Sequence, residues 1–451
     1  MKFWFHSLMV TVFTFLMMGA LYQFLQLNAL EAFDPIGQAI GELDLSDIAF
    51  SHLREGEPEP DENVTIVNSG WLTRGEIAKQ LESIILFKPR VIGIDIILDC
   101  DKPDPISCPD LDTLGTGALV KAFSHAEEAG IKVVMAQQLF QTRALLEKEG
   151  DTDTYDSIRH AGSAILQNAH EGFVNLDSDA NHQEDIKFCR ELPPMIMVNG
   201  QPELAFSVKI AMMYDPEKTS RFLMRGNKTE AINFRGNTPD LFDAVAPTYS
   251  GRYQFLDTDQ AMDTSQFTAD FIRDKVVIIG FHGNDIFDRT WEDKWFTPLN
   301  LVYAGRARPD MYGVVVHANA VSMILNEDYI DVMPMWQSVI VAILLVFLTT
   351  ALFFKIEEKL PIWYDLLSLV IQLGLFIMLS LAMILTFSYY SLKLEFTIPL
   401  AAVALVGTCF ELYKGGVLAS IEYFRAKLGK SEMEGPIAHA SDGGGSIRIP
   451  A

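Results

Sequence analysis

Residues 88–98 read KPRVIGIDIIL, and a second run, KVVIIG, follows at residues 275–280. From Val91 and from Val276 onward, both runs are apolar at consecutive positions except at Asp95, a pattern typical of strands that are buried on both faces of a parallel sheet. Between and around them, strand-like runs alternate with helical periodicities of about ten to fifteen residues. This alternation predicts an α/β fold in three layers, with a mainly parallel sheet and right-handed crossovers.

The expected elements follow from the spacing of apolar residues. Strands are expected at 64–67, 91–98, 131–136, 172–176, 231–234 and 275–280, and helices at 74–87, 117–129, 156–168, 203–214 and 314–326. The polar segments 55–62, 141–154 and 257–268 are expected to be surface loops.

Four apolar runs are long enough to cross a bilayer, for which about 20 helical residues suffice. They are Ser7–Leu27, Met335–Phe354, Ile362–Phe387 and Phe396–Tyr413. The first run also fits a secretory signal, but its length favours an uncleaved anchor. The sequence thus predicts an anchor (1–27), an α/β domain (28–334), three transmembrane helices (335–413) and a tail (414–451).

The chain carries 59 acidic and 35 basic residues, a formal charge of −24, and all of the excess acid lies in residues 28–334. Nucleic acid and anionic lipid surfaces repel such a segment and are excluded as its partners. The short basic segments, at Lys2, between the second and third runs and after the fourth, are expected in the cytoplasm. The large domain is therefore expected on the outer side of a bacterial cytoplasmic membrane, in the periplasm.

Common catalytic signatures are missing from the sequence, including the G-x-S-x-G elbow, H-E-x-x-H and the phosphate-binding G-x-x-x-x-G-K-S/T. Asp177-x-Asp179-x-Asn181 opens like a calcium loop, but His182 and Phe188 occupy the positions where Gly and Glu are needed. We predict neither a metal site nor a cofactor, and no enzymatic activity.

Four residues are candidates for ligand binding: Asp95, Asp99, Asp288 and His317. In open α/β sheets, ligands bind beyond the carboxyl ends of the strands, where Asp95, Asp99 and Asp288 are expected. Each has a structural alternative. Asp95 can cap a helix or pair with a base, Asp288 can form a turn, and His317 can be a packed core residue.

Cys100 and Cys108 flank an acidic loop and could close it as a disulfide, with Cys189 left over. Free or structural thiols are an equal alternative, and the pairing is undetermined by sequence. In the tail, Val417, Ile421, Phe424 and Leu428 have helical spacing with basic neighbours, which indicates a basic amphipathic helix at the inner leaflet or on a partner.

Together these segments resemble the CHASE2 family, the extracellular sensor domains of bacterial membrane receptors. The matching segments are 88–96, 172–175 with Asp177 and Asp179, 275–280, Asp288, Thr297-Pro298 and 313–319, framed by one span before and three after. Ala180 stands where the family has Gly. The family's members usually continue into a cytoplasmic output domain, for which residues 414–451 are too short.

The resemblance implies a membrane sensor that binds an extracytoplasmic ligand or protein and relays through its three C-terminal spans to a separate cytoplasmic signalling partner. A homo-oligomer is compatible with this hypothesis. The alternative is a scaffold subunit of an envelope complex that binds no small molecule. An exported hydrolase using Asp95, Asp99 or His317 is a third, weaker hypothesis, because no nucleophile and base pair is recognisable.

Overall fold

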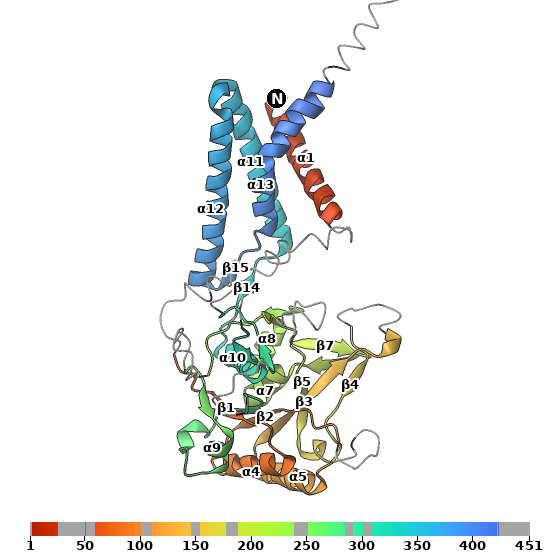
Figure 1. Cartoon of the computed structure of the whole chain (residues 1–451), viewed down its shortest axis with the longest axis vertical. Helices are drawn as coiled ribbons and strands as arrows, with labels where there is room; N and C mark the ends of the chain where they lie inside the picture. The colour runs from red at the N-terminus through yellow and green to blue at the C-terminus, as the bar shows by residue number, and fades with distance from the viewer. Residues whose placement is uncertain are drawn as a thin grey trace, which may run out of the picture. The chain divides into compact units, whose positions relative to one another are not determined.

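The computed structural model describes residues 2–25, 50, 59–100, 108, 111–145, 154–176, 188–238, 251–284, 292–300, 308–421 and 423 (Figure 1). The chain divides into two compact units. The membrane unit comprises Met1–Pro35, Met333–Ala382 and Leu394–Ala451, and the α/β unit comprises Ile36–Val332 and Met383–Lys393. Each unit is described by itself below.

The α/β unit is built on a mainly parallel sheet with the strand order β10-β1-β11-β2-β3-β4, in which β5 also pairs with β3. All of these pairings are parallel except that of β3 with β4. The late strand β11 lies between β1 and β2, which places it at the centre of the sheet. The strands are β1 (Val64–Asn68), β2 (Val91–Asp95), β3 (Lys132–Phe140), β4 (Ser157–Arg159), β5 (His170–Phe173), β10 (Gln254–Leu256) and β11 (Val276–Gly280).

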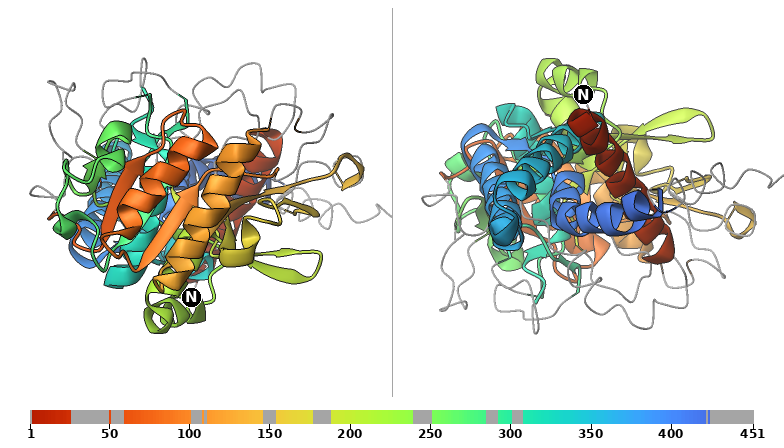
Figure 2. Two further views of the ribbon diagram at one scale, coloured as in Figure 1. Left: turned by 90° about the horizontal axis from the view of Figure 1, so that it is seen from below. Right: turned by 90° about the horizontal axis from the view of Figure 1, so that it is seen from above.

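Helices cover both faces of the sheet, which gives the three layers expected from the sequence. The helices α4 (Arg74–Ile85) and α5 (Thr113–Glu128) lie on one face, and α7 (Phe206–Tyr214) and α10 (Gly313–Asn326) lie on the other (Figures 1 and 2). Helix α8 (Pro216–Met224) packs beside α7 and α10.

Alternate residues of the central strands belong to two separate cores. Ile66, Val91 and Ile278 pack in the core under α7 and α10, whereas Ile92 and Ile279 pack in the core under α4 and α5. Because side chains alternate along a strand, burial on both faces requires apolar residues at consecutive positions. The unbroken runs in the sequence are the consequence.

Shorter elements surround the sheet. They are β6 (Glu191–Leu192) paired with β9 (Glu230–Ala231), β7 (Met195–Val198) paired with β8 (Gln201–Leu204), β12 (Lys294–Trp295) paired with β13 (Met311–Tyr312), β14 (Asp331–Val332) paired with β15 (Leu392–Lys393), the helix α9 (Thr258–Met262), and the 3-10 turns η3 (Leu166–Asn168) and η5 (Ala269–Phe271).

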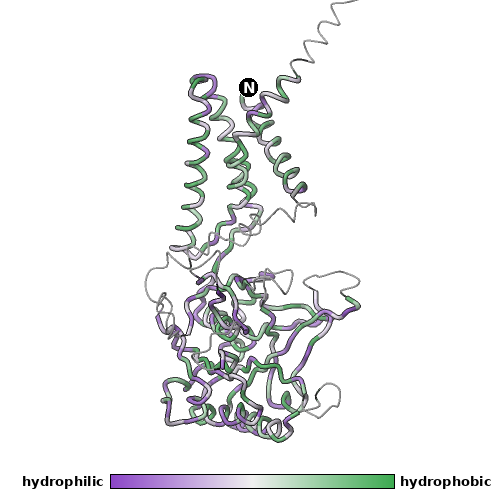
Figure 3. The backbone as a smooth tube through the Cα atoms, in the orientation of Figure 1, coloured by the Kyte–Doolittle hydropathy of each residue, from purple (hydrophilic) through white to green (hydrophobic). Residues whose placement is uncertain are grey.

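Among the described residues, four helices are long and apolar enough to cross a membrane: α1 (Lys2–Leu25), α11 (Met335–Lys359), α12 (Tyr364–Tyr390) with the preceding turn η6 (Pro361–Trp363), and α13 (Thr397–Leu412) with the π-helical segment η7 (Tyr413–Leu418). Figure 3 shows that apolar residues predominate along all four. Val10, Ala342, Val346, Val406 and Phe410 form a core where α1, α11 and α13 pack together. The protein is therefore a membrane protein, with one apolar span before the sheet and three after it.

Some expected elements are wrong. Residues 156–168, expected as a helix, form β4 and the 3-10 turn η3. The edge of β3 captures Ser157–Arg159 by antiparallel pairing, and such tertiary pairing overrides a weak helical periodicity. Within the expected loop 257–268, Asp257 caps α9 with a capping box to Gln260. The sequence also missed α8 and β10, which are short. The tail beyond residue 423 and Asp177, Asp179 and Asn181 lie outside the described residues.

Candidate functional site

Three neighbouring strands end in a row of residues at the carboxyl edge of the sheet. In the register of the central strands, Asn68 of β1 lies beside Gly280 of β11, and Gly280 lies beside Asp95 of β2. All three residues are an even number of positions from Ile66, Ile278 and Val91, so they face the α7 and α10 side of the sheet. The row thus stands at the edge where open α/β sheets bind ligands.

Asp95 is the charged member of this row. Its side chain is half-buried, and within the part of the chain that the structure describes no hydrogen bond or ion pair reaches its carboxylate. A side chain at Gly280 would approach the Asp95 Cβ atom to 3.1 Å and the Val314 Cγ2 atom of α10 to 2.8 Å, so glycine lets the carboxylate and the helix meet the sheet closely. Burial, with the charge of Asp293 adding to it, raises the pKa of Asp95 to about 8. The edge therefore holds a carboxylate whose negative charge the surrounding protein disfavours.

Asp293 lies at the amino end of α10. Its backbone carbonyl accepts a hydrogen bond from the Gly313 amide at 3.0 Å, and a side chain at Gly313 would meet its carboxylate oxygens at 3.0–3.1 Å. The first turn of a helix carries partial positive charge, which stabilises the Asp293 carboxylate.

Asn68 holds together the loops that follow the central strands. Its amide oxygen accepts hydrogen bonds from the backbone amides of Gly70, at 2.8 Å, and His282, at 2.9 Å. Its amide nitrogen donates to the Asp257 carboxylate at 2.8 Å. The Nε2 atom of the buried His282 lies 2.7 Å from the Thr238 hydroxyl oxygen. These contacts fix the backbone around Asp95.

Aromatic rings lie on the same edge. The exposed indole of Trp71, which follows β1, has its ring centre 5.0 Å from that of Phe281, the residue after Gly280. The ring of Phe281 lies 6.1 Å from that of Tyr312, which in turn lies 4.3 Å from the ring of His282. The Lys294 ammonium stands 4.5 Å from the centre of the Tyr312 ring. The edge thus combines a carboxylate with aromatic faces.

The four residues singled out in the sequence are not gathered in one place by the described structure. His317 is buried in α10, its ring 5.3 Å from that of Phe206, and burial lowers its pKa to about 4. Asp99 is exposed and pairs with Arg159 at 3.6 Å. Asp288 lies outside the described residues. Their roles in ligand binding stay predictions.

The neighbours of Asp95 were not found from the sequence. Asn68, Gly280 and Asp293 are far apart in the chain, and only the order of strands brings them together. The available signal for Asn68 and Gly280 was their position at the end of a strand, whereas Asp293 precedes β12 and is distant in sequence from α10.

Cys100 and Cys108 form a disulfide, and Cys189 and Cys409 are buried free thiols. A carboxylate oxygen of Asp99 and both sulfur atoms lie within 4.8 Å of one another, a grouping that could hold a metal. Because both sulfurs are in the disulfide, they offer no thiolate, and thiolates are the cysteine form that binds metals.

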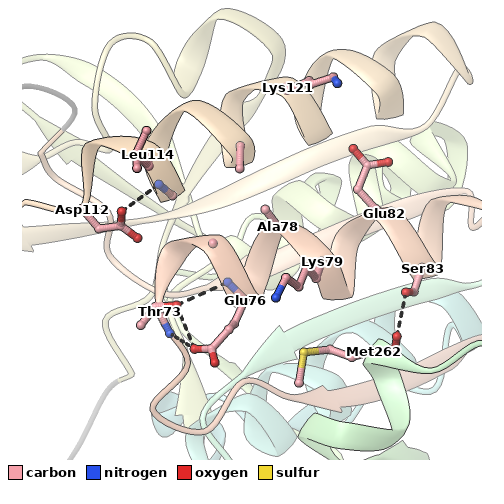
Figure 4. A pocket seen from close by; sticks show the side chains of 13 residues that line it. Thr73, Glu76, Ala78, Lys79, Glu82, Ser83, Asp112, Leu114, Lys121 and Met262 are labelled. Carbon is pink, nitrogen blue, oxygen red and sulfur yellow. Dashed lines mark hydrogen bonds between the residues drawn. The ribbon is translucent and has the colours of Figure 1, made fainter.

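A second surface lies on the opposite face of the unit, where α4 and α5 form a groove of about 820 Å³ (Figure 4). Thr73 and Glu76 form a capping box at the start of α4, and Asp112 caps α5 by accepting from the Gly115 amide at 2.8 Å. Glu82, Lys79, Lys121 and the exposed Leu114 also line the groove. Its mixed charges and open shape suit a protein surface better than a small molecule.

Comparison with known proteins identifies the family. The family model described as the CHASE2 domain matches residues 14–352. No curated protein and no solved structure gave a significant match. CHASE2 domains are of the sensor type and typically non-catalytic. Since the match covers more than half of the 451 residues and includes every strand of the central sheet, the chain belongs to the CHASE2 family.

Proposed function

We propose that the protein is a receptor-like sensor of a bacterial cytoplasmic membrane, whose α/β unit lies outside the cytoplasm and binds a ligand at the carboxyl edge of the sheet. The observation that carries the proposal is the Asp95 carboxylate, which ends a central strand without a hydrogen bond or ion pair among the described residues. The surrounding protein favours the neutral form of this half-buried carboxyl group, and a ligand that pairs with it would favour the ionised form.

Charge distribution supports the orientation. Lys355 and Lys359 lie near the end of α11, and Lys2 begins α1, so the positive-inside rule favours a cytoplasmic location for these helix ends. The disulfide between Cys100 and Cys108 fits an oxidising compartment outside the cytoplasm.

We propose that the signal leaves through α13 to a separate cytoplasmic protein. Two side-chain contacts tie the end of this helix to its neighbours: the Tyr413 hydroxyl lies 3.2 Å from the His6 Nδ1 atom of α1, and the Lys414 ammonium pairs with Glu357 of α11. The π-helical segment Tyr413–Leu418 begins at these residues. Such segments are frequent at functional sites in helices, and this one couples α13 to both other helices of the core. If the helices have two arrangements in equilibrium, a ligand shifts the equilibrium towards one of them only as far as it binds that arrangement more tightly than the other.

The test is a thermal-shift screen of the full-length protein in nanodiscs against small molecules, followed by titration of each hit. Asp95→Asn is expected to abolish the stabilisation by a true ligand. Asp274→Asn, which removes an exposed carboxylate before the amino end of β11, is the matched control and should retain it. Hits that stabilise both variants equally, or a complete absence of hits, would remove Asp95 from the sensing role.

The groove between α4 and α5 favours a second candidate function, that of an interaction subunit in an envelope complex. A photo-crosslinker at Leu114, whose side chain is 88% exposed in the groove, should then capture a stoichiometric partner in cells. The same crosslinker at Met224, 76% exposed on α8, is the control position. Equal capture at both positions would count against the scaffold function.

A further inference from the structure

The carboxyl edge of the sheet presents aromatic faces to solvent. Trp71 is 66% exposed although its ring packs 5.0 Å from that of Phe281. Ligand sites are commonly lined by aromatic side chains. An exposed aromatic ring leaves apolar surface in water, and a ligand that covers this surface gains the free energy of its burial. Phe281 directly follows Gly280, the strand neighbour of Asp95. Phe281 therefore follows the strand adjacent to that of Asp95, and Trp71 follows β1, the strand on the other side of β11.

The charge on this edge selects the sign of the ligand. Asp95 and Asp293 are close enough for the charge of Asp293 to disfavour the ionised form of Asp95. An anionic ligand would further disfavour the ionised form of Asp95, whereas a cation beside it would favour that form and pair with it. The formal charge of the chain, −24, acts in the same direction at longer range.

The protein itself already places a cation on this aromatic cluster. The Lys294 ammonium lies 4.5 Å from the centre of the Tyr312 ring, within the range of a cation–π interaction. Tyr312 is the ring neighbour of Phe281. Lys294 occupies the Tyr312 face, while the exposed indole of Trp71 is accessible to a second cation.

We infer that the ligand of the sheet edge is an organic cation, an amine or quaternary ammonium compound, whose charge is met by the Asp95 carboxylate and whose alkyl groups lie on Trp71 and Phe281. This inference rests on the proposed sensing function and specifies the ligand class. Trp71 supplies the ring face, which attracts cations through its quadrupole, and Asp95 supplies the neutralising charge.

The experiment is isothermal titration of the full-length protein in nanodiscs with tetramethylammonium, choline and putrescine. The uncharged carbon isostere of choline, in which carbon replaces the ammonium nitrogen, is titrated alongside. At least one cation should bind, and the isostere should bind at least about tenfold more weakly than choline if choline is the ligand that binds. Trp71→Leu, which keeps an apolar side chain without the aromatic face, and Asp95→Asn should each weaken binding about tenfold or more.

Two variants serve as controls: Phe140→Leu removes an aromatic side chain that is 40% exposed on β3, and Asp274→Asn removes an exposed carboxylate before the amino end of β11. Both should bind as the wild type does. Binding of none of the three cations, or binding that Trp71→Leu and Asp95→Asn leave unchanged, overturns the inference. If a neutral or anionic hit of the thermal-shift screen loses its effect in Asp95→Asn, the sensing function stands and the cation class is wrong.

Discussion

Asp95, half-buried at the end of β2, and His317, buried in α10, have environments that move their pKa values in opposite senses. Burial raises the pKa of Asp95 from 3.8 to about 8 and lowers that of His317 from 6.5 to about 4. In both cases the neutral form is favoured, because charge is costly where water is excluded. The difference is in the location: Asp95 is at the solvent edge of the sheet, whereas His317 lies within the core.

This difference predicts a pH-dependent effect of Asp95→Asn on stability. The folded protein binds the Asp95 proton more tightly than the unfolded chain, so the wild type loses stability as the pH rises from about 4 to about 8. The amide does not titrate. The variant should therefore melt at a higher temperature than the wild type at about pH 9, and this advantage should shrink towards about pH 4.

The measurement is the difference in melting temperature between variant and wild type across that range, in nanodiscs. Asp310, whose pKa burial raises to about 7, contributes a similar slope to both proteins and cancels in the difference. Asp99→Asn controls for the loss of one negative charge. A constant difference between Asp95→Asn and wild type at all pH values would contradict the burial of a protonated Asp95.

At the scale of elements, the contact between α4 and α5 depends on two glycines. A Cβ atom at Gly115 would lie 2.6 Å from the backbone nitrogen of Gly75 and still closer to the carboxylate of Asp112, the capping residue. Side chains at this crossing would force the helices apart and break the cap. The close approach is also what forms the floor of the groove in Figure 4.

Gly115→Ala is therefore expected to destabilise the α/β unit by about 1–3 kcal/mol through overpacking. Gly117→Ala, two residues along the same helix, has open space around its added methyl group and should stabilise by up to about 1 kcal/mol, the gain in helix propensity. Chemical denaturation followed by far-ultraviolet circular dichroism measures both. Equal effects of the two substitutions would show that α4 and α5 do not approach as described.

At the scale of the whole molecule, the proposed orientation makes a labelling prediction. A cysteine at Leu114 of the α/β unit should react with a membrane-impermeant maleimide in intact spheroplasts, because the side chain is 88% exposed. A cysteine at Ile362, 91% exposed between α11 and α12, should react only after the membrane is permeabilised. The wild type is the background control, since its free cysteines Cys189 and Cys409 are buried. Labelling of Ile362→Cys in intact spheroplasts, or protection of Leu114→Cys there, would reverse the orientation.

The sequence by itself determined the elements whose patterns are long or unbroken. The four apolar helices of the described residues are long and apolar enough to cross a membrane, a property that length and composition alone determine. The central strands β1, β2 and β11 were predictable because burial on both faces demands consecutive apolar residues. The helix expected at 156–168 failed because a short periodic pattern is a weak preference, which the edge of β3 overrode.

Tertiary structure alone decided the candidate site. The sequence marked Asp95 by its position after a strand, but it could not reveal that β11 inserts between β1 and β2 and sets Asn68, Gly280 and Asp95 in one row. It equally could not place Trp71 on Phe281 or Asp293 at the start of α10. The physical reason is that strand order is fixed by the packing of both cores together, a property of contacts between residues more than a hundred positions apart, whereas periodicity records only which face of each element is buried.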